Sequence, residues 1–509
     1  MRAPKALAAL ATIGGVLAIG SASEALETTP AQGTAPPIRA NVTITGAPLR
    51  AVAPVQRGFV GLSIEYPALA HYTGSDPLRP DRVFEQLVRG LSPGAAPVLR
   101  IGGDSTDATW WPVAGATRPP GAHYTLTPSW MAGARAVVRD LGARVIAGVN
   151  LEAHRPSLAI AEAQALLRGI GSRSVDAIEI GNEPSNYPRF PWYRASGRAV
   201  YARSTAYSFT EFTREFSTIR RGLPGVSLAG PALSGYGWLG HLGRFLGAEP
   251  TVTTATFHRY PLNRCFARPG SPMQATLSNL LGPYASRGFL APAAPYVALT
   301  HARGARFRLD EFNSVSCAGK LGLSDRFASA LWALDALFEV ARYGIDGVNV
   351  HTFPGVPYAP FDVSRTAGNW SAVVHPEYYG LLMFARAAPP GSRLLTVSGR
   401  TGDRVRIWAT RTVGGALHVV VINKSVTAPV SAMIRLPGAQ TPGLLERLTA
   451  PGVLAAGGVT LAGQQYASPT QTGMLTGRVQ TELVGPRAGR YRVMLPPASA
   501  AMLTLRVFR

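Results

Sequence analysis

Two glutamates stand at the ends of short apolar segments, where a carboxylate could act on a substrate. Glu183 closes the segment 176–183 and is followed by Pro184, and Glu311 closes the segment 306–311. Two carboxyl groups about 5–5.5 Å apart can cleave a glycosidic bond with retention of configuration. We therefore take Glu183 as the candidate general acid/base and Glu311 as the candidate nucleophile.

This chemistry needs the two carboxyl groups in different protonation states. A glycosidic oxygen is a poor leaving group unless it is protonated as the bond breaks, and a carboxylic acid beside a second carboxylate holds its proton more tightly. The second carboxylate attacks the anomeric carbon, and the first then deprotonates the hydrolytic water. A lone Asn-Glu-Pro motif could equally hold a salt-bridged structural glutamate, so the pairing with Glu311 carries the interpretation.

Apolar segments of this kind recur along the chain, with helical stretches between them. The predicted strands are 59–65, 98–104, 144–150, 176–183, 227–231, 254–260, 306–311 and 347–353. The predicted helices include 129–141, 158–170, 205–223 and 324–343. This alternation predicts an α/β fold, a (β/α)₈ TIM barrel, with an open doubly wound sheet as the alternative. No GxGxxG loop follows the first strand, so nothing supports nucleotide binding.

Polar residues gather at the carboxyl ends of these strands. They are Glu65, Asp104, Asn150, Glu183, His258, Tyr260, Glu311 and His351. In a barrel this end is the active-site face. The fourth and seventh strands place their last side chains across the mouth from each other, so we expect Glu183 and Glu311 to face one another.

The pattern changes after about Ala385, where the helical period ends. Segments 404–410, 417–423, 491–495 and 501–505 read as strands separated by turn residues, and 40–45 alternates in the same way. They predict an accessory antiparallel β-sandwich. We expect a signal peptide at 1–25, a leader and a sandwich strand at 26–50, the catalytic barrel at 51–384 and the sandwich at 385–509.

The first residues have the pattern of a secretory signal. Arg2 and Lys5 precede the uncharged apolar stretch 6–20, and small residues follow at 21–25. This predicts a secreted or periplasmic protein, with an uncleaved N-terminal anchor as the alternative. No later segment has the uninterrupted apolar length of a membrane span.

The chain of 509 residues carries a formal net charge of +22, almost entirely from arginine. Its only lysines are Lys5, Lys320 and Lys424. Codon bias of a GC-rich coding sequence explains an arginine excess, and attraction of an anionic substrate is the alternative. No basic run with interleaved aromatics is present, so we expect no nucleic-acid partner. The oligomeric state is left open.

The two cysteines, Cys265 and Cys317, follow the sixth and seventh predicted strands. In an exported protein they suggest one disulfide between neighbouring loops, and two free buried thiols are the alternative. Two cysteines alone do not make a metal site, and the chemistry above needs no metal or organic cofactor.

The residues around the two glutamates resemble a known family. The segment 178–184 resembles the acid/base strand of glycoside hydrolase clan A. The segments 310–319 and 323–332 resemble family 79 of that clan, the β-glucuronidase and heparanase family, and 99–103 and 258–260 support the match. The resemblance implies an exo-β-glucuronidase that acts on a glucuronic-acid-containing glycan or glycoside. The alternatives are an endo-acting heparanase-like enzyme, another clan A β-glycosidase, and a non-catalytic glycan-binding protein.

The resemblance also assigns roles around the sugar site. Glu65 matches a residue that bonds sugar hydroxyls, Asn182 one that contacts the 2-hydroxyl, and Tyr260 one that orients the nucleophile. Tyr358, with backbone amides near Gly319, matches the site of the uronate carboxylate.

Asp104 joins these residues as a substrate-binding candidate. One departure lies at 316–319, which reads Ser-Cys-Ala-Gly where family members often carry an aromatic residue and consecutive glycines. We expect this loop to be built differently, with its amides constrained by a Cys265–Cys317 bridge.

Overall fold

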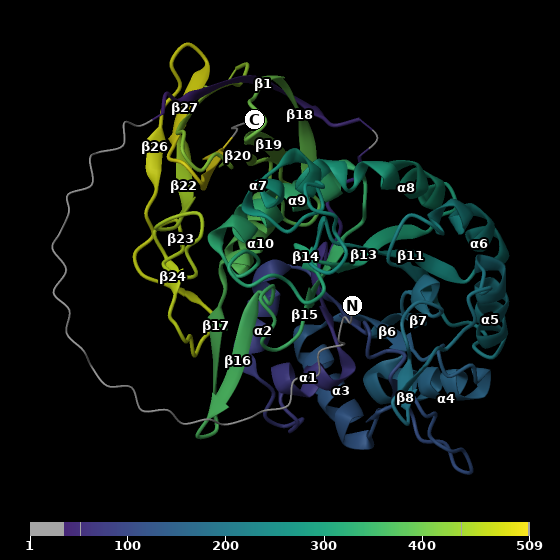
Figure 1. The fold of residues 1–509 in the computed structure, drawn as a ribbon. Coiled ribbons are helices and arrows are strands. Elements are labelled where there is room, and N and C mark those ends of the chain that lie inside the picture. The colour runs from purple at the N-terminus through teal and green to yellow at the C-terminus, as the bar shows by residue number, and fades with distance from the viewer. Residues whose placement is uncertain (1–34, 51, 439, 507–509) are drawn as a thin grey trace.

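The computed structural model describes residues 35–50, 52–438 and 440–506 (Figure 1). Eight parallel strands close a barrel in the order β10-β11-β13-β15-β2-β3-β6-β7. Their bounds are β2 Val60–Ile64, β3 Val98–Ile101, β6 Arg144–Val149, β7 Val175–Ile180, β10 Leu228–Leu233, β11 Val252–Arg259, β13 Arg306–Phe312 and β15 Val348–Thr352. These are the eight strands expected from the sequence, and the predicted TIM barrel is confirmed.

Helices cover the outside of the barrel (Figure 1). They are α1 Tyr66–Thr73, α2 Arg82–Leu91, α3 Pro128–Leu141, α4 Pro156–Leu166, α5 Phe209–Arg221, α6 Leu242–Ala248, α7 Leu277–Leu280, α8 Ala294–His301, α9 Phe327–Arg342 and α10 Pro376–Ala387. Short helical turns are η1 Leu167–Gly171, η2 Pro184–Asn186, η3 Leu239–His241, η4 Tyr284–Gly288 and η5 Ala291–Ala293. The predicted helix 205–223 starts later, because Ser208 caps α5 through a reciprocal capping box with Glu211.

The second sheet has ten strands and curls around a core of its own. Its strands are β1 Ile38–Pro48, β18 Arg393–Arg400, β19 Val405–Arg411, β20 Leu417–Asn423, β21 Val430–Arg435, β22 Gly443–Thr449, β23 Thr460–Leu461, β26 Glu482–Val484, β27 Arg490–Leu495 and β28 Ser499–Leu505. The accessory β domain is confirmed with two differences. It is one continuous curled sheet, and β1 pairs in parallel with β21 while it pairs antiparallel with β18.

Small two-stranded ribbons decorate the loops. They are β4 Thr109–Trp110 with β5 Tyr124–Thr125, β8 Tyr193–Ala195 with β9 Arg198–Val200, β12 Leu262–Asn263 with β14 Val315–Ser316, β16 Phe361–Thr366 with β17 Asn369–Val374, and β24 Gln465–Tyr466 with β25 Leu475–Thr476. The β12–β14 ribbon matters for the site, because it joins the loops that follow β11 and β13.

The interior of the barrel is charged where aliphatic side chains usually dominate. Arg100 on β3, Glu179 on β7 and Asp310 on β13 are all fully buried. Burying charges costs free energy unless they are paired, so such a cluster is expected where function requires it. The carboxyl ends of the same strands carry the predicted site.

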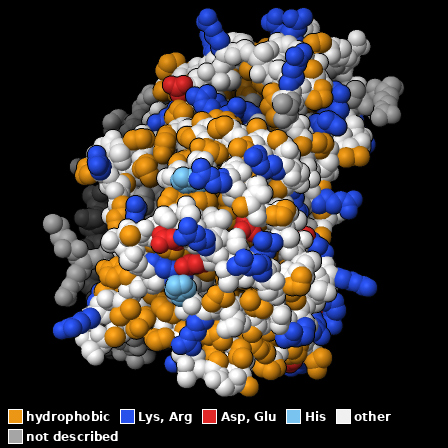
Figure 2. All heavy atoms as spheres, turned by 90° about the vertical axis from the view of Figure 1, so that its right-hand side faces the viewer, with side chains coloured by type: hydrophobic (Ala, Val, Ile, Leu, Met, Phe, Trp, Pro, Cys, Tyr) orange, Lys and Arg blue, Asp and Glu red, His pale blue; other side chains and the backbone are white. Residues whose placement is uncertain are grey.

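The predicted signal peptide and most of the leader lie outside the described residues. Among the described helices, none has both the length and the apolar character needed to cross a membrane. On the face that Figure 2 shows, the lysine and arginine side chains are spread out rather than gathered into one patch.

Candidate active site

Glu183 and Glu311 meet at the carboxyl end of the barrel. Glu183 lies just beyond β7, where its backbone takes a left-handed conformation with φ of 50° and its N–H donates to the Ala232 carbonyl at 3.0 Å. Glu311 lies near the end of β13. A carboxylate oxygen of Glu183 lies within 4.8 Å of one of Glu311. This is the close spacing expected of a nucleophile and an acid/base in a retaining glycosidase.

Glu311 is held as an anion by its neighbours. Arg100 Nη1 donates to Oε2 at 2.8 Å, and the Tyr260 hydroxyl donates to Oε1 at 2.9 Å. Burial alone would raise the pKa of Glu311, but His351, His258 and Arg100, with the Tyr260 bond, outweigh burial and hold that pKa well below its usual range. An ionised carboxylate fixed on both oxygens is suited to nucleophilic attack.

Glu183 is held less tightly and is more open to solvent. His258 Nδ1 lies 2.9 Å from Oε1, and Asn186 Nδ2 donates to Oε2 at 2.7 Å. Its side chain is 21% exposed, against 12% for Glu311. A group that must exchange protons with a leaving group and with water needs this access.

His258 contacts both carboxylates. Its Nδ1 is 3.7 Å from Glu311 Oε2 as well as 2.9 Å from Glu183 Oε1, and its Nε2 is 3.6 Å from Asp310 Oδ1. Burial disfavours the imidazolium, as does the Arg100 guanidinium, whose Nη2 lies 3.2 Å from Nε2. The carboxylates of Glu311 and Asp310 and the bond to Glu183 prevail, and raise the pKa of His258 to about 9.

Arg100 organises the floor of the site. Its Nε donates to Glu179 at 2.8 Å and lies 3.2 Å from Asp310, and its Nη2 donates to Asn182 Oδ1 at 2.9 Å. The role of Arg100 was not expected from the sequence, although an arginine inside the apolar strand 98–101 is an available signal. Asn182 is placed beside Glu183 by this bond.

Glu179 and Asp310 form a buried carboxyl pair close to His258. Burial and the charge of Glu179 raise the pKa of Asp310 well above its usual range. Burial also opposes ionisation of Glu179, but Arg100 and a hydrogen bond from Asp310 lower the pKa of Glu179. One proton shared by the pair, on Asp310, accounts for both directions.

Two groups of side chains have the spacing that could hold a metal ion: Glu179, His258 and Asp310, and Glu183, His258 and Glu311. In both groups a cation is already present, because the Arg100 guanidinium lies within 3.2 Å of Glu179, Asp310 and Glu311. The donor sets therefore fit a fixed guanidinium better than an added ion.

Glu65 lies at the end of β2, on the opposite side of Glu311 from His258. Its oxygens accept hydrogen bonds from the backbone N–H groups of Asp104 at 3.1 Å and Ser105 at 2.7 Å. Burial raises the pKa of Glu65 to about 7 against the opposing charge of His351. Asp104 is exposed, and its Oδ1 lies 3.4 Å from Asn182 Nδ2.

Tyr260, Tyr358 and the turn at Gly319 converge beside Glu311. The two tyrosine rings lie 6.2 Å apart, and a Cβ on Gly319 would lie 3.0 Å from Tyr358 Cδ1. Gly319 follows Cys317 and Ala318, and all three have positive φ. The Gly319 N–H donates to the Val315 carbonyl at 3.1 Å, and the contact expected between amides near Gly319 and a uronate carboxylate stays a prediction.

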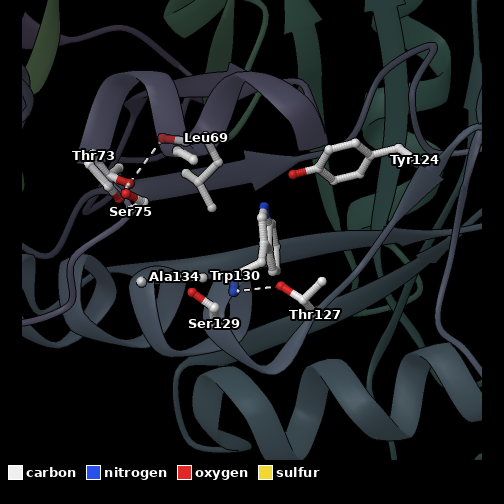
Figure 3. Close-up of a pocket in the computed structure, with 11 residues that line it drawn as sticks. Leu69, Thr73, Ser75, Tyr124, Thr127, Ser129, Trp130 and Ala134 are labelled. Atoms are coloured by element: carbon white, nitrogen blue, oxygen red, sulfur yellow. Dashed lines mark hydrogen bonds between the residues drawn. The ribbon is translucent and has the colours of Figure 1, made fainter.

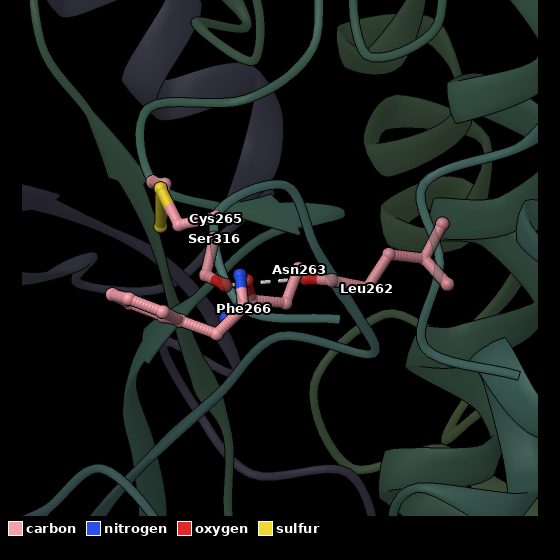
Figure 4. The surroundings of a disulfide bond; sticks show 6 residues. Leu262, Asn263, Cys265, Phe266 and Ser316 are labelled. Atoms are coloured by element: carbon pink, nitrogen blue, oxygen red, sulfur yellow. Dashed lines mark hydrogen bonds between the residues drawn. A yellow bond between two sulfur atoms is a disulfide. The ribbon is translucent and has the colours of Figure 1, made fainter. Parts of the chain in front are cut away.

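Cys265 and Cys317 form a disulfide with a Cα–Cα distance of 6.2 Å. Their loops run side by side because Asn263 pairs with Ser316 across the β12–β14 ribbon (Figure 4). The bridge thus anchors the left-handed turn that packs on Tyr358.

A separate cavity of about 180 Å³ between α1 and α3, lined by Trp130 and Tyr124 among others, includes none of the predicted site residues (Figure 3).

No family model matches this sequence, and no curated protein matches it. Solved structures do match it along most of its length. A 4-O-α-L-rhamnosyl-β-D-glucuronidase from Fusarium oxysporum 12S, solved with Rha-GlcA, has a TM-score of 0.70 and 20% identity, covering 92% of this chain and 100% of that one. At 20% identity this likeness shows the fold, a (β/α)₈ barrel with an accessory β domain.

Arabinofuranosidases of family 51 share the same architecture. The enzyme from Xanthomonas axonopodis pv. citri has a TM-score of 0.61 and 16% identity, and the one from Thermotoga petrophila RKU-1 has 0.65 and 14%. Each covers 92% of this chain and 100% of its own. The barrel with an accessory β domain expected from the sequence is confirmed, and the choice of sugar rests on the site.

Proposed function

We propose that this protein is a retaining exo-β-glucuronidase that removes β-linked glucuronic acid by double displacement. The observation that carries the proposal is the approach of Glu183 and Glu311 to within 4.8 Å at the carboxyl ends of β7 and β13. That spacing leaves no room for a water between the carboxylates and the sugar, as an inverting enzyme would need.

In the first step Glu311 attacks the anomeric carbon while Glu183 gives its proton to the departing glycosidic oxygen. The C1–O bond breaks, and an ester forms between C1 and a Glu311 oxygen. In the second step Glu183 takes a proton from water, which displaces Glu311 and releases the sugar with its original anomeric configuration. Arg100 and Tyr260 hold the Glu311 carboxylate in line throughout.

The preference for glucuronic acid rests on the pocket beside Glu311. The Tyr358 hydroxyl and the amides of Cys317 and Ala318 would supply hydrogen-bond donors to a C6 carboxylate beside Glu311. Glu65, Asp104 and Asn182 would bind the ring hydroxyls. The likeness to a solved glucuronidase agrees with this assignment.

A panel of aryl glycosides tests the proposal. 4-Nitrophenyl β-glucuronide should be hydrolysed, and the β-glucoside, β-xyloside and α-L-arabinofuranoside should be cleaved far more slowly. Cleavage of the arabinofuranoside alone would favour the activity named for the family 51 structures. Loss of chain length in heparan or hyaluronan fragments, measured by size, would favour endo action instead.

The site of action is part of the proposal. The charged and apolar pattern of residues 2–25 supports export by a signal peptide, so the enzyme would act outside the cytoplasm. A periplasmic or culture-medium fraction that lacks the protein in the native host would contradict this.

A further inference from the structure

Two exposed phenylalanines, Phe190 and Phe266, lie against each other on the loops that follow β7 and β11. The rings of Phe190 and Phe266 are 6.1 Å apart at their centroids, and the residues are 40% and 61% exposed. In the described part of the chain this is the only ring pair in which both members are exposed. Apolar surface left in water has an unfavourable hydration free energy, so a pair of bare rings at a barrel mouth calls for an occupant.

Phe190 belongs to the turn that holds Glu183. The backbone N–H of Phe190 donates to the Asn186 carbonyl at 3.0 Å, and the Asn186 side chain donates to Glu183 Oε2 at 2.7 Å. The glycosidic oxygen of the leaving group must lie next to Glu183, because Glu183 protonates this oxygen in the proposed mechanism. The leaving group therefore emerges beside the turn that carries Phe190.

Phe266 comes from the loop after β11, next to the disulfide. Its N–H donates to Asn263 Oδ1 at 2.6 Å, and Cys265 is bonded to Cys317. In Figure 4 its ring points away from the buried Leu262. The bond and the bridge anchor the backbone of the segment 263–266, which leads up to the Phe266 ring, so less backbone freedom is lost when this ring binds a partner.

We propose that Phe190 and Phe266 form the leaving-group subsite and that its occupant is an aryl aglycone. The inference rests on the proposed function and adds the class of leaving group. A flat aromatic ring can stack in offset or edge-to-face geometry on such a pair, whereas an alkyl group gains much less contact. Each aromatic contact adds about 0.5–1.5 kcal/mol, or about two- to twelve-fold in affinity.

The test compares phenyl β-glucuronide with methyl β-glucuronide in the full-length protein. The ratio of their kcat/KM values is measured for wild type, Phe266→Ala, Phe190→Ala and Phe266→Trp. The ratio should fall about three- to ten-fold in each alanine variant, and Phe266→Trp should restore it. Leu444→Ala, an exposed apolar side chain on β22, should keep the wild-type ratio.

An unchanged ratio in Phe266→Ala would overturn the subsite. If Phe266 had a purely structural role, its loss would lower kcat/KM for both substrates by the same factor. An effect confined to a glucuronyl disaccharide would assign the rings to a sugar and overturn the aryl choice. A wild-type dimer that dissociates in Phe266→Ala, seen by light scattering, would assign them to a second copy of the chain.

A binding experiment separates this inference from the proposed function. Free 4-methylumbelliferone is titrated into each protein and followed by its fluorescence, which requires no catalysis. If the wild type cleaves no glucuronide yet binds this ring several-fold more tightly than Phe266→Ala, the glucuronidase fails and the aryl subsite stands. Equal binding by both proteins would sink the subsite whatever the enzyme cleaves.

Discussion

At the scale of single residues, His258 contacts both carboxylates of the proposed catalytic pair. Its Nδ1 atom lies 2.9 Å from Glu183 Oε1 and 3.7 Å from Glu311 Oε2. With a pKa of about 9, the ring is an imidazolium at neutral pH. It therefore stabilises the anionic form of Glu311.

Replacing His258 by Gln should change the pH dependence of stability. Because the folded state raises the pKa of His258 from 6.5 to about 9, the folded protein binds more protons than the unfolded protein in that window. The stabilisation from His258 is complete below pH 6.5 and is lost as the pH rises through about 9. Urea unfolding from pH 5 to 10 should show the free energies of unfolding of wild type and His258→Gln converging at high pH. A difference between them that stays constant across this range would contradict the pKa assigned to His258.

Replacing Glu183 by Ala should slow substrates according to their leaving groups. A general acid contributes about 10²–10⁴-fold when the leaving group is poor, and little when the leaving group departs without a proton. Methyl β-glucuronide should therefore lose far more in kcat/KM than 2,4-dinitrophenyl β-glucuronide. Asp403→Asn, at an exposed turn of the β domain, is the control. Equal losses on both substrates would remove the acid/base role.

Residue type and strand-end position predicted that Glu183 and Glu311 would lie close together, and the structure brings their carboxylates to within 4.8 Å. The sequence could not predict the partners of the pair, because Arg100 and Glu179 come from strands 79 residues apart and meet only after the barrel closes. The opposite pKa shifts of Glu179 and Asp310 also depend on burial that no local pattern encodes.

At the scale of elements, the turn after β3 shows how backbone shapes the site. Gly103 has φ of 108°, and a Cβ there would lie 2.2 Å from Glu65 Oε1. This close approach lets the N–H groups of Asp104 and Ser105 reach the Glu65 carboxylate. Only glycine combines that conformation with that clearance.

Gly103→Ala should therefore displace Glu65 as well as destabilise the fold. We expect the free energy of unfolding to fall by about 1–3 kcal/mol more in Gly103→Ala than in Gly94→Ala. At Gly94 φ is 66°, but nothing lies within 4 Å of the added Cβ. Thermal unfolding and the KM for 4-nitrophenyl β-glucuronide measure the two effects. Equal behaviour of the two variants would mean that the contact with Glu65 is not the constraint.

Element positions followed from the sequence better than element ends. The alternation of apolar strands with longer helical stretches predicted all eight barrel strands, because burial on both faces gives each strand a short apolar run. The left-handed turns at Glu183 and at 317–319 were not predicted. Non-glycine residues rarely take this conformation, and tertiary contacts must impose it.

At the scale of the whole molecule, a buried ion cluster joins the barrel to the curled sheet. Asp335 on α9 accepts from Lys424 at 2.6 Å and from Trp408 at 3.0 Å, and it pairs with Arg406 at 3.3 Å. Burial would raise the pKa of Asp335, but Lys424 and Arg406 lower it to about 2. Lys424 is 1% exposed, which is unusual for one of only three lysines.

Lys424→Met should destabilise the protein by about 3–5 kcal/mol, because it leaves Asp335 buried without its closest cation. The double variant Asp335→Leu with Lys424→Met should recover much of this loss, since no unpaired charge remains. Urea denaturation of the three proteins measures the difference. A double variant no more stable than the single one would show that packing, rather than the charge, is what matters at this interface.

The presence of a barrel with a β domain could be predicted from period and turn residues alone. The curl of one sheet around its own core could not, because the parallel pairing of β1 with β21 joins segments almost 400 residues apart. The proposed choice of glucuronic acid depends on a pocket assembled from the loops after β11, β13 and β15, which no single stretch of sequence describes.

The most direct measurement is covalent trapping of the intermediate. A 2-deoxy-2-fluoro-β-glucuronyl fluoride should glycosylate the protein: a carboxylate attacks the anomeric carbon, fluoride leaves, and an ester to C1 forms. The fluorine at C2 slows both steps, but the good leaving group at C1 keeps the first step fast enough for the ester to accumulate. Peptide mass spectrometry should find one fluoroglucuronyl group on Glu311, and Glu311→Gln should take up none and lose on the order of 10⁴-fold or more in turnover. A label on another residue, or full turnover by Glu311→Gln, would contradict the account.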